Sequence, residues 1–143
     1  MTIEEIIKNL PALLSAILMA VLFIQSGLDK VFDWKGNIEW LTGHFSKTFL
    51  SGMVPMMVAT ITVAEIITGL LSAAGTVYFI ITGSTAIIFL AAVSGACSIL
   101  ALFFGQRIAK DYPGAAVLVP YFILLIIVIY LTNPYAATSA SPS

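Results

Sequence analysis

A long stretch with almost no charge is the feature that most restricts the fold of this chain. From Met53 to Gly105 the only charged residue is Glu65, and in the full 143 residues 60% are hydrophobic and 9% are charged. Helices built from such a stretch are apolar on every side, and helices of that kind belong in lipid or in buried protein. The chain is therefore predicted to be an all-α integral membrane protein.

Four segments have the length of roughly 20 apolar residues that a membrane-crossing helix needs. They are residues 11–32, 53–75, 83–105 and 115–131. The boundary between the second and third spans is open, because Gly75-Thr76 and Thr82-Gly83-Ser84 can both form a turn. Either connection is short, so these two spans should form an antiparallel pair. We expect a compact four-helix bundle in one transmembrane domain, residues 11–132.

The segments outside the four spans are short. Residues 1–10 are predicted to be an amphipathic lead-in, and residues 133–143 a disordered polar tail, since the tail is rich in Ser, Ala and Pro. Between the first two spans, apolar residues recur at the spacing of one helix face: Trp34, Ile38, Leu41 and Phe45. This pattern predicts an amphipathic helix that lies in the membrane interface.

The basic residues predict how the spans are oriented. Lys30, Lys35 and Lys47 follow the first span, and Arg107 and Lys110 follow the third. These two loops lie on the same side of the membrane because two spans separate them. The positive-inside rule places both loops in the cytoplasm and both termini outside. The net charge of −1 argues against nucleic acid as a partner.

A polar stripe ends the first span. Its members follow the helical spacing i, i+3, i+4, i+7: Ser26, Asp29, Lys30 and Asp33. A charge in the hydrocarbon costs about 2.5 kcal/mol or more, so such groups pair or face a cavity. Three interpretations remain open. They are a snorkelling helix end with an exposed ion pair, a polar pocket for a head group or polar ligand, and a contact with another protein.

Glu65 lies near the middle of the second span, among several Thr, Ser and Gly residues. A carboxylate at that depth is costly unless a cation reaches it. Of the candidate cations Lys30, Arg107 and Lys110, depth favours Lys30. Glu65 is the candidate catalytic residue, able to transfer a proton or to bond a quinone-like oxygen. The alternative is a glutamate that only holds helices together.

The remaining polar residues give weaker indications. Cys97 is the only cysteine, so no internal disulfide can form, and a packing role is predicted. His44 is the only histidine and is expected at the interfacial surface, so no metal site is predicted. Arg107 and Asp111 are one helical turn apart and can pair. If the two basic loops share a polar pocket, its candidate residues are Asp29, Lys30, Asp33, Glu65 and Arg107.

Three short motifs resemble the DoxX family of small bacterial four-helix membrane proteins. FIQSGLDKVFDW (residues 23–34) is similar to the G-x-x-K element of the family's first helix. AEIITGLL (residues 64–71) is similar to its second-helix glutamate followed by glycine, and GQRIAKDYPGAA (residues 105–116) to Bacteroidota-type members. The resemblance extends from about residue 17 to residue 131.

The resemblance singles out Gly27 and Lys30 in the first helix, and Glu65 and Gly69 in the second. It implies a four-helix fold in the bacterial inner membrane. The family includes, or is similar to, a membrane subunit linked to thiosulfate:quinone oxidation, and most members have no established activity. The resemblance therefore implies fold and location more than reaction.

Two functions from different classes follow. The first is an accessory or stabilising subunit of a larger membrane assembly, without a cofactor. The second is a quinone-linked redox component in which Glu65 and Lys30 bind the quinone or move its proton. The sequence leans to the first, because it contains one cysteine and no redox-cofactor motif. The expected partners are the lipid bilayer and other membrane subunits, and enzymatic activity is left open.

Overall fold

Every regular element of the computed structural model, which describes residues 2–135, is helical. The elements are α1 (Ile3–Lys8), α2 (Leu10–Phe32), α3 (Trp34–His44), the 3-10 turn η1 (Ser51–Met53), α4 (Val54–Thr82), α5 (Ala86–Ile108) and α6 (Tyr112–Thr132). The predicted polar tail lies mostly outside the described residues, at 136–143. The predicted lead-in corresponds to α1, which a capping box between Thr2 and Glu5 begins.

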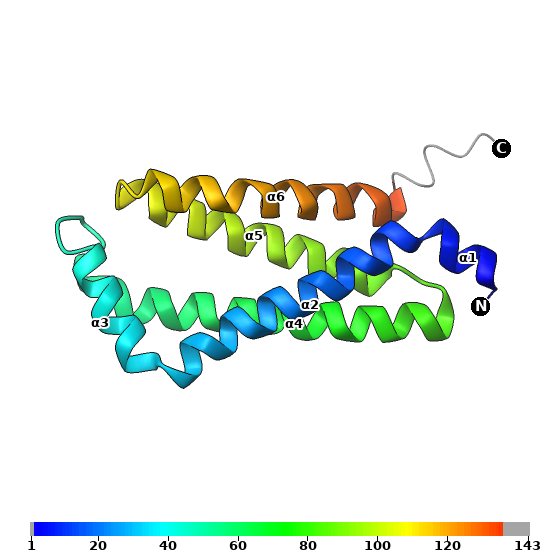
Figure 1. Ribbon diagram of the computed structural model, residues 1–143, viewed down its shortest axis with the longest axis horizontal. Coiled ribbons are helices and arrows are strands. Elements are labelled where there is room, and N and C mark those ends of the chain that lie inside the picture. The colour runs from blue at the N-terminus through cyan, green and yellow to red at the C-terminus, as the bar shows by residue number, and fades with distance from the viewer. Residues whose placement is uncertain (1, 136–143) are drawn as a thin grey trace.

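Four helices in the described part of the chain are long and apolar enough to cross a membrane: α2, α4 with its preceding turn, α5 and α6. The all-α prediction and the presence of four helices of membrane-spanning length are thus confirmed. They pack into one elongated bundle, with α2 against α4 and α5 between α4 and α6 (Figure 1). The location of α3 in the membrane interface stays a prediction.

Of the two turn sites that the sequence left open, the structure has the one at Thr82-Gly83-Ser84, so the second span extends beyond the expected residue 75. Helix α4 continues through Gly75 and is 29 residues long. It ends at Gly83, which has the left-handed φ of 79° that glycine adopts without a steric penalty. Gly75 instead allows close packing, since a Cβ there would lie 2.9 Å from the backbone nitrogen of Ile88 on α5. A hydrophobic run alone could not distinguish a turn glycine from a packing glycine.

The two basic loops lie at one end of the bundle. Helix α3 and the α5–α6 turn are at this end, and α1 and the end of α6 are at the other (Figure 1). His44 at the end of α3 lies 3.0 Å from the side chain of Gln106 near the end of α5, so the loops are in direct contact. The prediction that these loops share a side is confirmed, and which side of the membrane they face stays a prediction.

Two glycines let α2 and α4 approach closely. A Cβ at Gly69 on α4 would lie 2.8 Å from the backbone nitrogen of Ile24 on α2. A Cβ at Gly27 on α2 would lie 2.6 Å from the Ile66 side chain on α4. Such reciprocal small-residue contacts are how membrane helices approach one another, because no hydrophobic effect drives association in lipid. The close α2–α4 packing brings the end of α2 within side-chain reach of the middle of α4.

Gly69→Ala should separate α2 from α4. The added methyl group meets the backbone of Ile24, which cannot rotate away, so we expect a loss of about 1–3 kcal/mol of stability in detergent. Denaturant titration of the purified protein would measure it. Gly43→Ala in α3 is the matched control, since a Cβ there contacts nothing within 4 Å. Equal stability of the two variants would contradict the close-packing role of Gly69.

Candidate functional site

One face of α4 carries a row of buried polar side chains: Thr62, Glu65, Thr68 and Ser72. Two of them bond within their own helix, since Thr62 donates to the Val58 carbonyl at 2.6 Å and Ser72 to the Thr68 carbonyl at 2.7 Å. Thr68 also shares a 2.7 Å hydrogen bond with Ser94 on α5. The hydroxyl groups are therefore satisfied inside the bundle. Glu65 is the member of the row whose negative charge needs a positive counter-charge from another helix.

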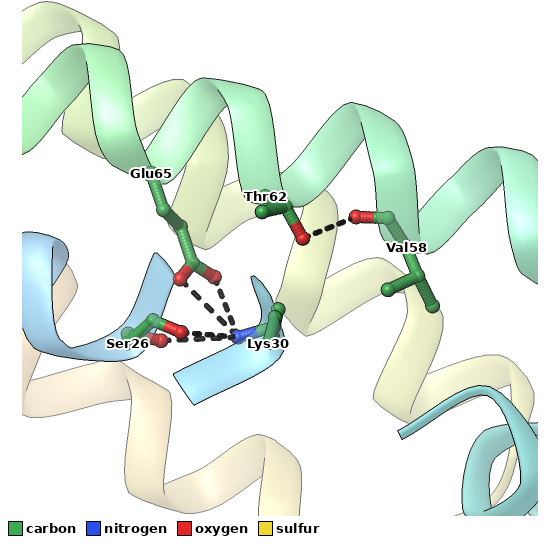
Figure 2. A network of polar contacts seen from close by, with 5 residues as sticks. All are labelled: Ser26, Lys30, Val58, Thr62 and Glu65. Atoms are coloured by element: carbon green, nitrogen blue, oxygen red, sulfur yellow. Dashed lines mark hydrogen bonds and ion pairs between the residues drawn. The ribbon is translucent and has the colours of Figure 1, made fainter. Parts of the chain in front are cut away.

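Lys30 of α2 supplies the positive counter-charge. Its ammonium Nζ lies 3.2 Å from each carboxylate oxygen of Glu65. The same nitrogen donates to the Oγ of Ser26 at 3.0 Å and to the Ser26 carbonyl at 3.4 Å, one turn earlier on α2. Figure 2 shows the Glu65 and Lys30 side chains meeting between the helices, with the ammonium also joined to Ser26 of its own helix. The pairing of Lys30 with Glu65, favoured from depth, is observed.

The two oxygens of Glu65 are not equivalent. Oε2 accepts a hydrogen bond from Lys30, whereas Oε1 is buried and has no hydrogen-bond partner in the described structure. Oε1 is nevertheless 3.2 Å from Nζ, close enough for an ion pair but poorly aligned for a hydrogen bond. The ammonium still attracts Oε1 at this distance, because Coulomb attraction depends on separation more than on angle. The Lys30 ammonium thus attracts both oxygens of Glu65 and donates a hydrogen bond to Oε2.

The pair is buried asymmetrically. The Glu65 side chain is 2% exposed, whereas the Lys30 side chain is 18% exposed. Removing two charges from water costs several kcal/mol for each ion, and attraction between them offsets this cost only with good geometry. The exposed part of Lys30 is therefore the part of the pair that another molecule can reach.

Lys30 reaches a cavity of about 390 Å³ between α3, the first half of α4 and the second half of α5. The lining is mostly apolar and includes Leu41, Phe45, Met53, Met56, Met57 and Phe104. Thr60 and Gln106 add polar atoms, and Lys30 is the only charged residue among those that line it. The cavity thus combines a flexible, methionine-rich apolar wall with one cationic donor.

Helix α3 closes the cavity at the loop end. The ring of Phe45 lies 3.6 Å from the position of a Cβ on Gly105 of α5. His44 contacts Gln106 at 3.0 Å and Asp111 at 3.6 Å through the same ring nitrogen, and stacks on Trp40. His44 was predicted to be an interfacial surface residue. It is instead part of a polar contact that holds α3 against the α5–α6 turn.

Of the five residues of the predicted polar pocket, Lys30 lines the cavity, and Asp29, Asp33 and Arg107 lie away from both the cavity and the ion pair. Asp29 and Asp33 are exposed and are not among its lining residues. Arg107 is also exposed, and its guanidinium lies 4.7 Å above the ring of Tyr112. The Arg107–Asp111 pair considered from their spacing is replaced by the contact between His44 and Asp111. The structure therefore brings together Lys30 and Glu65 and separates them from the other three.

Two further expectations differ from the structure. Cys97 was predicted to be a packing residue, but its side chain is exposed on α5. Glu65 would line a cavity if it contacted a ligand directly, and it is absent from the lining of the cavity beside it. Gln106 and the three methionines were not singled out from the sequence. Only the amphipathic pattern of α3 indicated that an apolar surface there needed a partner.

Comparison with protein-family models, with curated proteins and with solved structures gives no match to this chain. The resemblance to the DoxX family rests on its short motifs alone and stays a prediction. Two of the positions that carry it, Gly27 and Gly69, form the close α2–α4 contact, and the other two form the ion pair.

Lys30→Met should destabilise the protein strongly. Methionine keeps most of the length of the lysine side chain but leaves the Glu65 carboxylate buried without a counter-charge, which costs about 3–5 kcal/mol. Thermal unfolding in one detergent would measure the loss. Lys35→Met, at an exposed lysine of α3, is the control and should unfold like the unaltered protein.

The double variant Lys30→Met/Glu65→Gln removes both charges and should recover most of the lost stability, because replacing a whole buried pair is often nearly neutral. If Lys30→Met unfolded at the same temperature as Lys35→Met, the pair would have no structural role.

Proposed function

We propose that this chain is a membrane protein that binds an amphiphilic molecule of the quinone type. One observation supports the proposal above others: the apolar cavity has a single charged lining residue, Lys30, and that residue is held in place by Glu65. Ligand pockets are typically mostly apolar with a few polar groups that fix orientation, at volumes of about 300–1,000 Å³. The cavity fits that description.

The two parts of such a ligand have matching partners. The apolar ring substituents and tail contact the methionine and aromatic side chains, and an oxygen of the polar head accepts a hydrogen bond from Lys30. Glu65 is a positioning residue in this proposal, because it holds the ammonium without lining the cavity. The chain has one cysteine, so it cannot cycle an internal disulfide.

An accessory role in a larger membrane assembly is the second proposal. The polar side chains of Gln25 and Asp29 are exposed along the outer face of α2. Polar groups at membrane depth usually face protein or water rather than lipid. A neighbouring subunit on this face would give them partners. Isolation in mild detergent together with another protein at a fixed ratio would support this role, and isolation as a single species would contradict it.

We also propose a location for the chain, the bacterial inner membrane. Four helices long enough to cross a membrane make the chain a candidate multi-pass membrane protein. The DoxX-like motifs support the bacterial inner membrane. The basic residues of the two adjacent loops support a cytoplasmic position for α3 and the α5–α6 turn.

Decylubiquinone should bind to the purified protein and quench its tryptophan fluorescence. Both tryptophans, Trp34 and Trp40, belong to α3, which forms one wall of the cavity. Ala101→Phe fills part of the cavity and should weaken binding by about tenfold or more, equivalent to 1.4 kcal/mol. Ala59→Phe is the matched control, because Ala59 is exposed on α4 and does not line the cavity.

Equal quenching of the two variants would place the quinone elsewhere, for example in the detergent around the helices. Absence of binding in the unaltered protein, combined with a stoichiometric partner in mild detergent, would favour the accessory role over the quinone-binding one.

Single cysteines should report the orientation of the chain. In a Cys97→Ala background, Glu4→Cys in α1 should react with a membrane-impermeant maleimide in intact cells. Lys47→Cys, in the exposed segment after α3, should be protected until the cells are opened. The opposite labelling pattern would reverse the proposed orientation.

A further inference from the structure

We infer that Glu65 sets the charge preference of the cavity, so that it selects a neutral hydrogen-bond acceptor over an anionic head group. The inference rests on the proposed function, because it concerns the ligand of the same cavity. It assigns Glu65 a role in specificity although Glu65 does not line the cavity.

The first step concerns charge. Lys30 is the charged group that lines the cavity, and its charge is balanced by a carboxylate with both oxygens at 3.2 Å from Nζ. Glu65 is 1% exposed, so water does little to screen it. The site that a ligand meets is therefore a neutral pair with a hydrogen-bond donor at its surface. It is not an isolated cation.

The second step concerns distance. An anionic oxygen bonded to Nζ would lie about 2.8 Å from it. With Nζ at 3.2 Å from the Glu65 oxygens, that anion would be at most about 6 Å from the same carboxylate. Coulomb energy falls inversely with distance, so Glu65 cancels about half of the attraction that Lys30 alone would provide. An anion would still lose its own hydration in an apolar cavity.

The third step concerns hydrogen bonds. An ammonium has three N–H donors, and those of Lys30 are shared among Glu65, the Ser26 hydroxyl and the Ser26 carbonyl. The weakest contact is the one to the Ser26 carbonyl, at 3.4 Å. A neutral carbonyl or amide oxygen can replace that contact and leave the ion pair intact. The carboxylates of Asp29 and Asp33 are exposed and do not line the cavity, so the carboxylate that acts on Lys30 is that of Glu65.

Two ligands that differ in head-group charge alone test the inference. Dibromostearamide and dibromostearate have the same tail, and their bromine atoms quench tryptophan fluorescence on contact. At a pH at which the fatty acid is ionised, the unaltered full-length protein should bind the amide at least about tenfold more tightly, a difference of 1.4 kcal/mol. Glu65→Gln leaves Lys30 without its counter-charge, so this variant should bind the stearate at least as tightly as the amide.

The double variant Lys30→Met/Glu65→Gln is the control, and it should not favour the stearate because it lacks the cation. Equal binding of both ligands by the unaltered protein, or tighter binding of the stearate, would overturn the inference even if Glu65→Gln failed to fold. Failure of both stearoyl ligands and of decylubiquinone to bind would instead reject the proposed function. A preference for the amide that persisted in a folded Glu65→Gln protein would show that Glu65 does not set it.

Discussion

The close contact between α2 and α4 is the constraint on which the candidate site depends. Gly27 and Gly69 leave room for Ile66 and Ile24 of the facing helix, so the helix backbones lie nearer than larger residues would allow. Only at that separation can the Lys30 ammonium reach both oxygens of Glu65 across the interface. Gly27 and Gly69 thus determine whether Lys30 and Glu65 can form an ion pair. The pair in turn determines the charge on the lining of the cavity.

The sequence was sufficient to predict the features that depend on composition and depth. The four apolar runs require helices in lipid, since each backbone group there must be satisfied within its own segment. A lone carboxylate in a long uncharged stretch requires a cation, and only Lys30 lies at a similar depth. The common side of the two basic loops follows from the number of spans between them. These predictions needed no knowledge of how the helices pack.

The features that depend on packing could not be predicted. Gly75 and Gly83 have the same local signal, yet one contacts Ile88 inside the bundle and the other ends α4 with a positive φ. Asp29 and Lys30 are neighbours in one polar stripe, yet one is exposed and the other is paired. The helical spacing placed both residues near one face of α2. Which of the two is covered depends on where α4 packs against that face. The residues that line the cavity come from α2, α3, α4 and α5, so the pattern of a single segment could not predict it.

A buried ion pair is a poor way to hold two helices together, and this bears on its role here. An apolar pair of similar volume would often stabilise such a contact as well as or better than two charges. An apolar pair could not present an N–H donor inside an otherwise apolar cavity, however. Lys30 lines the cavity with 18% of its side chain exposed, whereas the Glu65 side chain is 2% exposed and does not line it. In the proposed function this asymmetric burial separates two tasks: the carboxylate fixes the position and the charge of the ammonium, and the ammonium binds the ligand. This division of roles supports ligand binding over a purely structural role for the pair.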